Sequence, residues 1–337
     1  NNSELFNKLL DDFSQDDLKQ FCKNLGEETF IGSSGRIFPK SFKASPLLRS
    51  WLSELREQNV VFKTNHNWIG WKKDKLVFKN NGSEVSIKAD ITLFALGGLS
   101  WPKLGSDGSW IKIFEKEKIK IIKPQPSNCG FHVNWSCIFK NKFSGKPLKT
   151  IRVNHKNQEF KGEFIMTSEG VEGGLIYTLS SLIRETINEE GHAEITIDLK
   201  PDLKIDQIEK KLSNERAKLT LTNLLRKALK LSDVAIGLII EQKNKNKIKN
   251  FEINKLAFII KNYKLILEKP FAIERCISTA GGVSFDSIDD NFMTKNKNKT
   301  YIMGEMLDWE APTGGYLLQA CISNGAYVAK QIIKEYS

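Results

Sequence analysis

The chain has 337 residues, of which 40% are apolar and 27% charged, so it can bury a core and is not a disordered chain. Its length suits one large domain together with a second one. The longest apolar runs are too short to cross a bilayer, and the first residues show no basic and apolar leader. We therefore expect a cytoplasmic protein with no membrane partner and no signal peptide.

The chain is basic, with 51 Lys and Arg against 40 Asp and Glu and a net charge of +11. A basic balance raises nucleic acid or a membrane surface as partners. The excess is mostly Lys, and its densest run, residues 243–249, alternates with Asn. Arg is scarce, and Arg is the residue that forms bidentate hydrogen bonds with phosphates and base edges. We therefore expect a solvated basic surface, a Lys/Asn run that is exposed, mobile and dispensable, and no nucleic-acid partner.

Cysteine and histidine give no sign of a metal site. The five cysteines are an odd number, widely scattered and without a CxxC pair, and the four histidines show no HExxH spacing. These patterns disfavour a zinc site and a disulfide framework, and a reduced cytoplasmic setting follows. Cys276 and Cys321, neither of which has a partner nearby in the sequence, are expected to be buried structural thiols.

The first third of the chain predicts helices followed by short strands. Residues 3–25 indicate two helices, and a glycine-punctuated segment covers 31–43. Ser45 and Pro46 are typical of an N-cap and a first helical residue, and apolar residues at helical spacing follow them. A strand is expected at 60–64 and a three-stranded meander at 68–71, 75–79 and 84–88.

Residues 91–96 form a continuous apolar run that ends in Gly97 and Gly98. A run that is apolar on both faces is typical of a central parallel strand. We expect this strand to lie in the middle of the main sheet.

The pattern changes between about 125 and 270. Strands are expected at 130–133, 148–154, 158–166 and 192–199, with a helix of about fifteen residues opening after the glycines at 169–174. Residues 203–262 are predicted to be helical throughout. This stretch is interpreted as an inserted β plus helical domain, 125–270.

The last part of the chain returns to an α/β pattern. Strands are expected at 264–267, 272–277 and 301–303, a glycine turn at 279–283, and a final helix to about residue 334. We therefore predict that residues 1–124 and 271–337 are two parts of one domain. Strands from 28–124 and 271–337 would share its sheet.

Two buried strands with glycine-rich exits, 93–98 and 301–304, mark a candidate ligand site, because ligands bind at the carboxyl ends of strands in open α/β sheets. Glu305 follows the second strand directly and is able to accept hydrogen bonds from ligand hydroxyls. Gly314 and Gly315 then open a helix, whose free N–H groups suit an anion. Strand-end glycines and helix caps are also common in proteins without a ligand.

Five stretches together resemble the BaiN/YhiN-type flavoproteins, a family of NAD(P)/FAD-dependent oxidoreductases that includes aminoacetone oxidase and a bile-acid reductase. The resemblance covers essentially the whole chain, and the sequence GGYLLQ places it in one branch of the family. The stretches are GSSGRIFPKSFKASPLL at 32–48, ALGGLSWPKLGSDG at 95–108, GEFIMTSEGVEGGLIYTLS at 162–180, STAGGVSFD at 278–286 and GEMLDWEAPTGGYLLQACISNG at 304–325.

The resemblance implies a Rossmann-type FAD-binding domain split by an inserted domain with a β-barrel-like part and a helical part. It implies FAD as cofactor, with NAD(P)H as a possible dissociable reductant. Glu305 with Gly304 would hold the ribityl chain, the backbone at 314–318 would face the flavin pyrimidine, and Gly97 and Gly98 would pass close to the pyrophosphate. The full implied set is Gly35, Arg36, Gly97, Gly98, Gly281, Gly304, Glu305, Gly314, Gly315, Tyr316, Leu317 and Leu318.

The chain departs from the family pattern in one respect. The family opens with a strand and a GxGxxG turn for the ADP pyrophosphate, and this sequence contains no GxGxxG. Since the first residue is not Met, we expect the chain to be the larger part of a longer FAD enzyme rather than a natural truncation.

The catalytic residues stay open, with Glu172, Tyr177 and Trp309 as candidates for contact with the substrate or for proton transfer. The favoured function is an FAD-dependent oxidoreductase on a small molecule, with NAD(P)H or oxygen as redox partner. The alternatives are an RNA-modifying flavoprotein and an incomplete chain that cannot hold FAD by itself. The substrate and the oligomeric state do not follow from the sequence.

Overall fold

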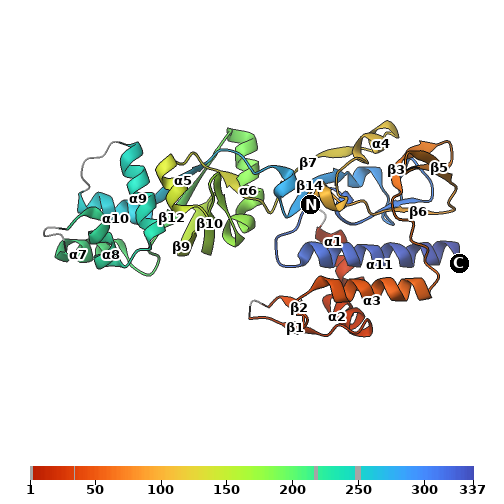
Figure 1. Ribbon diagram of the computed structural model, residues 1–337, viewed down its shortest axis with the longest axis horizontal. Helices are drawn as coiled ribbons and strands as arrows, with labels where there is room; N and C mark the ends of the chain where they lie inside the picture. Colours follow the sequence, from red (N-terminus) through yellow and green to blue (C-terminus); the bar gives the residue numbers. More distant parts are fainter. Residues whose placement is uncertain (1–2, 34, 216–218, 247–251) are drawn as a thin grey trace. The chain divides into compact units, whose positions relative to one another are not determined.

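The computed structural model describes residues 3–33, 35–215, 219–246 and 252–337, and the chain forms two compact units (Figure 1). Unit 1 contains residues 1–125 and 279–337, and unit 2 contains residues 126–278. The expected second boundary, between 270 and 271, lies eight residues too early. Residues 271–278 belong to unit 2 because the Phe271 N–H donates to Gly130 O at 2.8 Å and the Asn128 side chain donates to Ser278 Oγ at 2.8 Å. No described helix has both the length and the apolar content of a membrane span.

Unit 1 combines short strands with five helices in its described part. The helices are α1 (Ser3–Asp12), α2 (Gln15–Asn24), α3 (Ala44–Glu57), α4 (Ile111–Lys116) and α11 (Tyr316–Tyr336). The strands are β1 (Thr29–Ile31), β2 (Ile37–Pro39), β3 (Asn67–Lys72), β4 (Lys75–Asn80), β5 (Ser83–Ile87), β6 (Thr92–Phe94), β7 (Ile121–Ser127), β14 (Ser278–Val283) and β15 (Thr300–Ile302).

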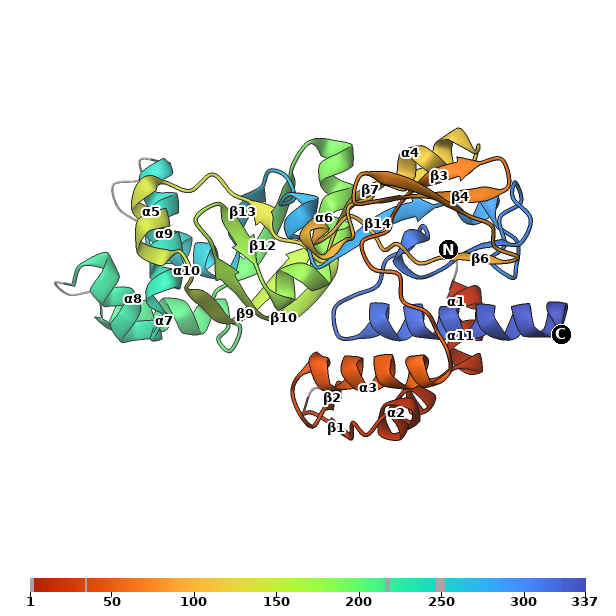
Figure 2. The same cartoon turned by 45° about the vertical axis from the view of Figure 1, so that its right-hand side comes forward.

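The two N-terminal helices are confirmed. Ser14 caps α2 in a capping box with Asp17, which satisfies N–H groups that no helical carbonyl can reach. Helix α1 packs against α11, so the first and last segments of the chain lie together in unit 1 (Figure 2). The glycine-punctuated segment is a hairpin in which β1 and β2 pair antiparallel.

Two expectations for residues 44–64 are wrong. Helix α3 begins at Ala44 with Lys43 as its N-cap, so Ser45 lies inside the first turn and no side chain caps the helix. Pro46 is still accommodated, because the first N–H groups of a helix have no helical partner. The expected strand at 60–64 does not form, since no described strand pairs with it, and Val60, Val61 and Phe62 are exposed.

The three-stranded meander β3–β4–β5 is confirmed as an antiparallel sheet. Strand β6 pairs with β15 in parallel register, Thr92 opposite Thr300 and Phe94 opposite Ile302. The two outer segments of the chain therefore share a sheet, as predicted. Burial of β6 on both faces is wrong, because Phe94 is buried while Leu93 is 46% exposed and no described strand pairs with the other edge of β6.

The segment from 272 to 283 is the reverse of what we expected. Residues 273–275 form a 3₁₀ turn instead of a strand, and residues 278–283 form the buried strand β14 instead of a glycine turn. Glycine is required within β14 because another chain lies against it. A Cβ on Gly282, whose φ is +135°, would lie 2.3 Å from Met306 O.

Unit 2 is built on one six-stranded antiparallel sheet in the order β13–β12–β9–β10–β11–β8. The strands are β8 (Phe131–His132), β9 (Pro147–His155), β10 (Gln158–Met166), β11 (Gly170–Glu172), β12 (Ala193–Asp198) and β13 (Tyr263–Leu267). The helices are α5 (Cys137–Phe143), α6 (Gly174–Glu190), α7 (Ile205–Glu215), α8 (Leu221–Leu229), α9 (Asp233–Lys245) and α10 (Ile253–Lys261).

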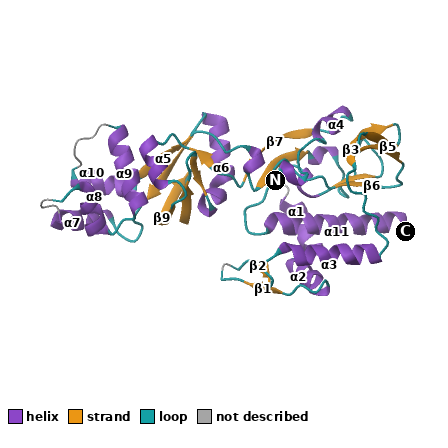
Figure 3. Cartoon of the chain, viewed as in Figure 1, coloured by secondary structure: helices purple, strands orange, loops and turns teal. Residues whose placement is uncertain are grey.

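The sheet of unit 2 curls until its two edges meet. The His132 N–H donates to Lys269 O at 2.8 Å and the Glu268 N–H donates to His132 O at 2.9 Å, so β8 bonds the residues that directly follow β13. Helix α6 packs on this sheet, and helices α7 to α10 form a helical part that contacts the sheet through α9 and α10 (Figure 3). Unit 2 therefore contains the expected β part and helical part, and its β part is a curled antiparallel sheet.

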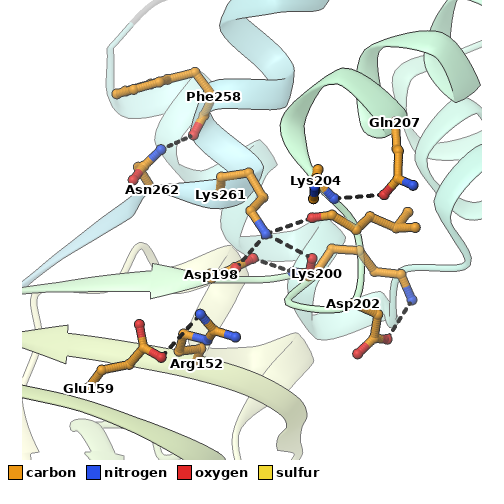
Figure 4. A network of polar contacts seen from close by, with 11 residues as sticks. Arg152, Glu159, Asp198, Lys200, Asp202, Lys204, Gln207, Phe258, Lys261 and Asn262 are labelled. Carbon is orange, nitrogen blue, oxygen red and sulfur yellow. Dashed lines mark hydrogen bonds and ion pairs between the residues drawn. The ribbon is translucent and has the colours of Figure 1, made fainter.

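A buried ion pair joins the sheet of unit 2 to its helical part (Figure 4). Lys261 Nζ at the end of α10 lies 2.6 Å from a carboxylate oxygen of Asp198 at the end of β12. The same ammonium donates to the carbonyls of Lys200 and Leu203, at 3.2 and 2.7 Å. A buried ammonium needs these partners to offset its loss of hydration.

The structure describes only part of the Lys/Asn run at 243–249, which was expected to be exposed and mobile. Lys243 lies in α9 and is half-buried, so full exposure is wrong at that position. Residues 247–249 and the side chain of Lys245 lie outside the described part of the chain.

Candidate functional site

The carboxyl ends of β6 and β15 meet at one edge of their sheet, because the strands are parallel. Gly97 and Gly98 follow β6, and Gly304 and Glu305 follow β15 in a short 3₁₀ turn. Strand ends on one edge are the usual ligand-binding position in an α/β sheet. The structure thus brings four of the predicted residues together from segments about two hundred positions apart.

The Glu305 carboxylate is held by backbone donors from two other segments. The Thr279 N–H donates to Oε1 at 3.0 Å, and the Gly98 N–H is a second donor. Burial raises the pKa of Glu305, and these two hydrogen bonds oppose that rise only in part. The carboxylate is therefore a half-buried acceptor with lone pairs beyond those that the two N–H groups use.

Thr279 links this acid to the glycine turn after β6. Its hydroxyl Oγ1 accepts the Leu99 N–H at 2.8 Å, while its backbone N–H serves Glu305. A Cβ on Gly98 would lie 2.5 Å from that hydroxyl and 3.2 Å from Cδ of Glu305. Gly98 is therefore required for the close approach of three segments.

Gly304 is fixed by a residue that our sequence interpretation missed. Its N–H donates to Oδ1 of Asn324 at 2.8 Å, and Asn324 is buried on α11. The only sequence signal is a polar residue on the buried face of an apolar helix. Cys321, on the same helix, lies next to Gly304, and burial raises the pKa of its thiol to about 12.

A second group forms where α11 begins. A Cβ on Gly314 would lie 3.1 Å from Nε of Arg36 and 3.3 Å from the ring of Tyr316, so the predicted Arg36 lies beside the predicted helix start. Gly315 is the N-cap, with φ of +95°, and no side chain caps the helix. Tyr316 and Leu318 are exposed, and Gly35 is also exposed on the hairpin.

Gly281 and Trp309, two of the predicted site residues, have contacts that explain their presence without a ligand. Gly281 faces a neighbouring strand, since a Cβ there would lie 2.6 Å from Lys123 O. Trp309 packs on Phe6, with ring centroids 4.5 Å apart, and donates its indole N–H to Gly304 O at 3.0 Å. Trp309 therefore supports Gly304, and its contacts do not mark it as a catalytic residue.

Glu172 and Tyr177 lie in unit 2, where β11 ends and α6 begins. Burial raises the pKa of the Tyr177 hydroxyl, and Glu172 adds to the rise. The thiols of Cys129 and Cys276 lie close enough to contribute as well. These groups belong to unit 2, whereas Glu305 belongs to unit 1.

The site in unit 1 fits a cofactor that carries hydroxyls and a region of developing negative charge. The half-buried Glu305 carboxylate has lone pairs that can accept hydrogen bonds from hydroxyls, and the start of α11, which no side chain caps, can present N–H groups to an anion. Both features are met by the ribityl chain and the ring of a flavin. No GxGxxG turn for a pyrophosphate is present in the sequence.

Comparisons with known proteins identify the family of the chain. Residues 1–331 match the family model described as the HI0933-like protein Rossmann domain. The chain is 23% identical to a 3-dehydro-bile acid delta(4,6)-reductase of Clostridium scindens, over 98% of this chain and 83% of the relative. It is 25% identical to a ribosomal RNA dihydrouridine synthase of Haemophilus influenzae, over 87% of this chain and 70% of the relative.

Among solved structures, the chain is similar to a 3-ketosteroid delta1-dehydrogenase from Sterolibacterium denitrificans in complex with 1,4-androstadiene-3,17-dione. The TM-score is 0.42 and the identity 14%, and the match covers 86% of this chain and 63% of that chain. A likeness at this level carries no argument about activity. The match over nearly the whole chain is the decisive finding: the protein belongs to the HI0933-like family of Rossmann-type flavin-dependent oxidoreductases.

Proposed function

We propose that this protein is an FAD-dependent oxidoreductase that holds the flavin at the carboxyl ends of β6 and β15. The observation that carries the proposal is the half-buried Glu305 carboxylate, which two backbone N–H groups hold in place at the end of a strand. A partly desolvated carboxylate with spare lone pairs is stabilised when a ligand donates hydrogen bonds to it. Hydroxyls of the ribityl chain are donors of that kind.

Each remaining residue of the site has a role in binding and orientation. Gly97 and Gly98 keep the turn after β6 free of side chains, and Gly304 is held in place by Asn324 and Trp309. The first N–H groups of α11 would face the flavin where negative charge gathers on reduction. FAD supplies the two-electron chemistry, while the protein binds it and excludes competing reactions.

The proposed substrate is a small molecule, and the proposed redox partner is NAD(P)H or oxygen. The bile-acid reductase among the relatives supports reduction of a small molecule. RNA is a second candidate substrate, because another relative acts on ribosomal RNA and most of the net positive charge comes from residues 126–278.

The test is flavin binding followed by a search for the redox partner. Purified protein is titrated with FAD and the quenching of flavin fluorescence is measured, and the loaded protein is then mixed anaerobically with NADH or NADPH. Bleaching near 450 nm identifies the reductant, and reoxidation by air or by candidate acceptors identifies the acceptor. A protein that binds FAD no better than a Glu305→Ala variant does would contradict the proposed site.

A further inference from the structure

Cysteines 129 and 276 lie at the seam where the curled sheet of unit 2 closes. The seam is the row of backbone hydrogen bonds between residues 130–132 and residues 268–271. Cys129 directly precedes this row, and Cys276 follows it after one short turn. The seam therefore brings together two cysteines that are 147 positions apart in the sequence.

Both thiols are held within this corner of unit 2. Cys129 is 1% exposed and Cys276 is 2% exposed. The Cys276 thiol donates to the Ala272 carbonyl at 3.2 Å and accepts a hydrogen bond from the Cys129 thiol. Asn128 fixes the other side, since its N–H donates to Ser180 Oγ at 3.0 Å and its side chain donates to Ser278 Oγ.

The hydrogen bond between the two thiols favours a thiolate at Cys276. The hydrogen bond from Cys129 lowers the pKa of Cys276, and the neighbouring Arg275 acts in the same direction. Burial and Glu274 act against it. Arg275 is itself held by Glu169, at 2.7 Å. A thiolate next to a second thiol is the arrangement from which a disulfide forms.

We propose that Cys129 and Cys276 are a redox-active pair that hydrogen peroxide converts to an intramolecular disulfide. The Cys276 thiolate attacks one peroxide oxygen, the O–O bond breaks, and the sulfenic acid and one water form after proton transfer. The Cys129 sulfur then attacks the Cys276 sulfur and displaces the second water. The two sulfurs lose two electrons in total, and the peroxide is reduced to two waters.

The disulfide would close a loop that contains almost the whole of unit 2. Cross-linking the ends of so long a loop restricts the unfolded chain strongly. We expect the Tm of unit 2 to rise by about 5–10 °C after oxidation and to return after treatment with dithiothreitol. This inference does not depend on a bound flavin, because the peroxide is added from outside.

The experiment removes the exposed cysteine by its accessibility and identifies the pair by peptide mapping. Native protein is treated with a bulky maleimide, which labels the exposed Cys137 and is excluded from the buried pair and from the buried Cys22. Peroxide is then added, the protein is denatured, and the remaining thiols are counted before and after reduction. Peptide mapping without reductant identifies the bonded cysteines.

The expected result is the loss of two thiols, a mass decrease of two hydrogens and one cross-linked peptide that joins Cys129 to Cys276. The matched control, Cys137→Ser, should form the same cross-link. Cys129→Ser and Cys276→Ser should both lack it, and both should lose the rise in Tm. A peroxide-treated wild-type protein with both thiols free, over-oxidised or bonded to other cysteines would overturn the proposal, and this result does not depend on whether the variants fold.

Discussion

The two units differ in how they use their apolar side chains. Unit 2 buries one continuous cluster beneath a single curled sheet and its helices. Unit 1 divides its strands among four small sheets around a smaller cluster. It leaves many large apolar side chains exposed, namely Leu48, Trp51, Val60, Val61, Phe62, Leu93, Leu96, Trp101 and Leu104.

The difference has a chemical counterpart. In unit 2 the largely buried ion pair of Asp198 with Lys261 serves the packing of its own elements. In unit 1 the half-buried acid, Glu305, has two backbone partners and no cation among the described ion pairs. A complete ion pair needs no ligand, whereas a partly desolvated carboxylate without a cation is stabilised by a ligand that donates hydrogen bonds to it. Changes in unit 2 should therefore act on stability, and changes around Glu305 should act on flavin binding.

The largest effect is expected from Asp198→Asn, which leaves the Lys261 ammonium without its carboxylate. The exposed fractions of the two side chains are 7% and 20%, so the remaining charge is largely desolvated. We expect a loss of about 3–5 kcal/mol in the free energy of unfolding. Urea unfolding, followed by circular dichroism, measures this loss, and FAD affinity should not change in the folded protein.

The matched control is Glu194→Gln, in the same strand of unit 2. It breaks the 2.8 Å pair with Lys264, whose side chains are 61% and 41% exposed. An exposed pair contributes no more than about 1 kcal/mol. If Asp198→Asn lowered the free energy of unfolding no more than this control does, the ion pair would not stabilise unit 2. The proposed contrast between the two units would then be wrong on this point.

Glu305→Gln should weaken FAD while it stabilises the protein without FAD. Loss of a hydrogen bond to a charged group corresponds to about 1.5–3 kcal/mol, or roughly ten- to hundredfold in the dissociation constant. Isothermal calorimetry with FAD measures this change. Circular dichroism should show that the variant is folded, which separates weaker binding from loss of structure.

The effect on stability depends on pH. The pKa of Glu305 is higher in the folded protein than the ordinary value of 4.5, so folding opposes ionisation. Stability therefore falls as the pH rises from the ordinary value through the folded one. The Gln variant should lack this loss and should have a higher Tm than the wild type at pH 8. Equal Tm values at pH 4 and pH 8 for both proteins would mean that the acid is not desolvated.

A smaller effect is expected from Gly315→Ala, compared with Gly191→Ala. Both glycines have positive φ, +95° and +81°, and a Cβ at either position would meet nothing within 4 Å. Each substitution should cost about 1–2 kcal/mol of stability from backbone strain alone. Only Gly315, at the start of α11, should also lower FAD affinity. Equal FAD affinity in the two variants would show that the start of α11 does not contribute to FAD binding.

Local pattern was sufficient for most elements. The two N-terminal helices, the β3–β5 meander and most strands of unit 2 follow from turn residues and alternation, which act over a few positions. The errors lie where distant segments decide. The strand expected at 60–64 has no described pairing partner. The glycines of β14 were taken for a turn, but they are needed because the backbone of other segments lies too close to leave room for a Cβ.

The candidate site was predictable in its parts but not in its connections. Glycines and an acid at strand ends indicated Gly98, Gly304 and Glu305 directly. The hydrogen bonds of Thr279 and Asn324 depend on the packing of β14 and α11, and no spacing in the sequence encodes them. The same holds for Cys129 and Cys276, which only the closure of the sheet brings together.

The smallest effect is expected from replacing the four lysines at 243, 245, 247 and 249 with Gln. Charges that do not contact a ligand act on it only through solvent, and at physiological salt their field is screened within about 8 Å. We expect the dissociation constant of FAD to stay within about twofold of the wild-type value, with unchanged unfolding. The same variant tests whether the substrate is an RNA. If these lysines contact RNA phosphates, the variant should bind RNA more weakly, and its binding constant should depend less steeply on salt concentration. Loss of turnover on a small-molecule substrate, with FAD still bound, would contradict the division of roles between the two units.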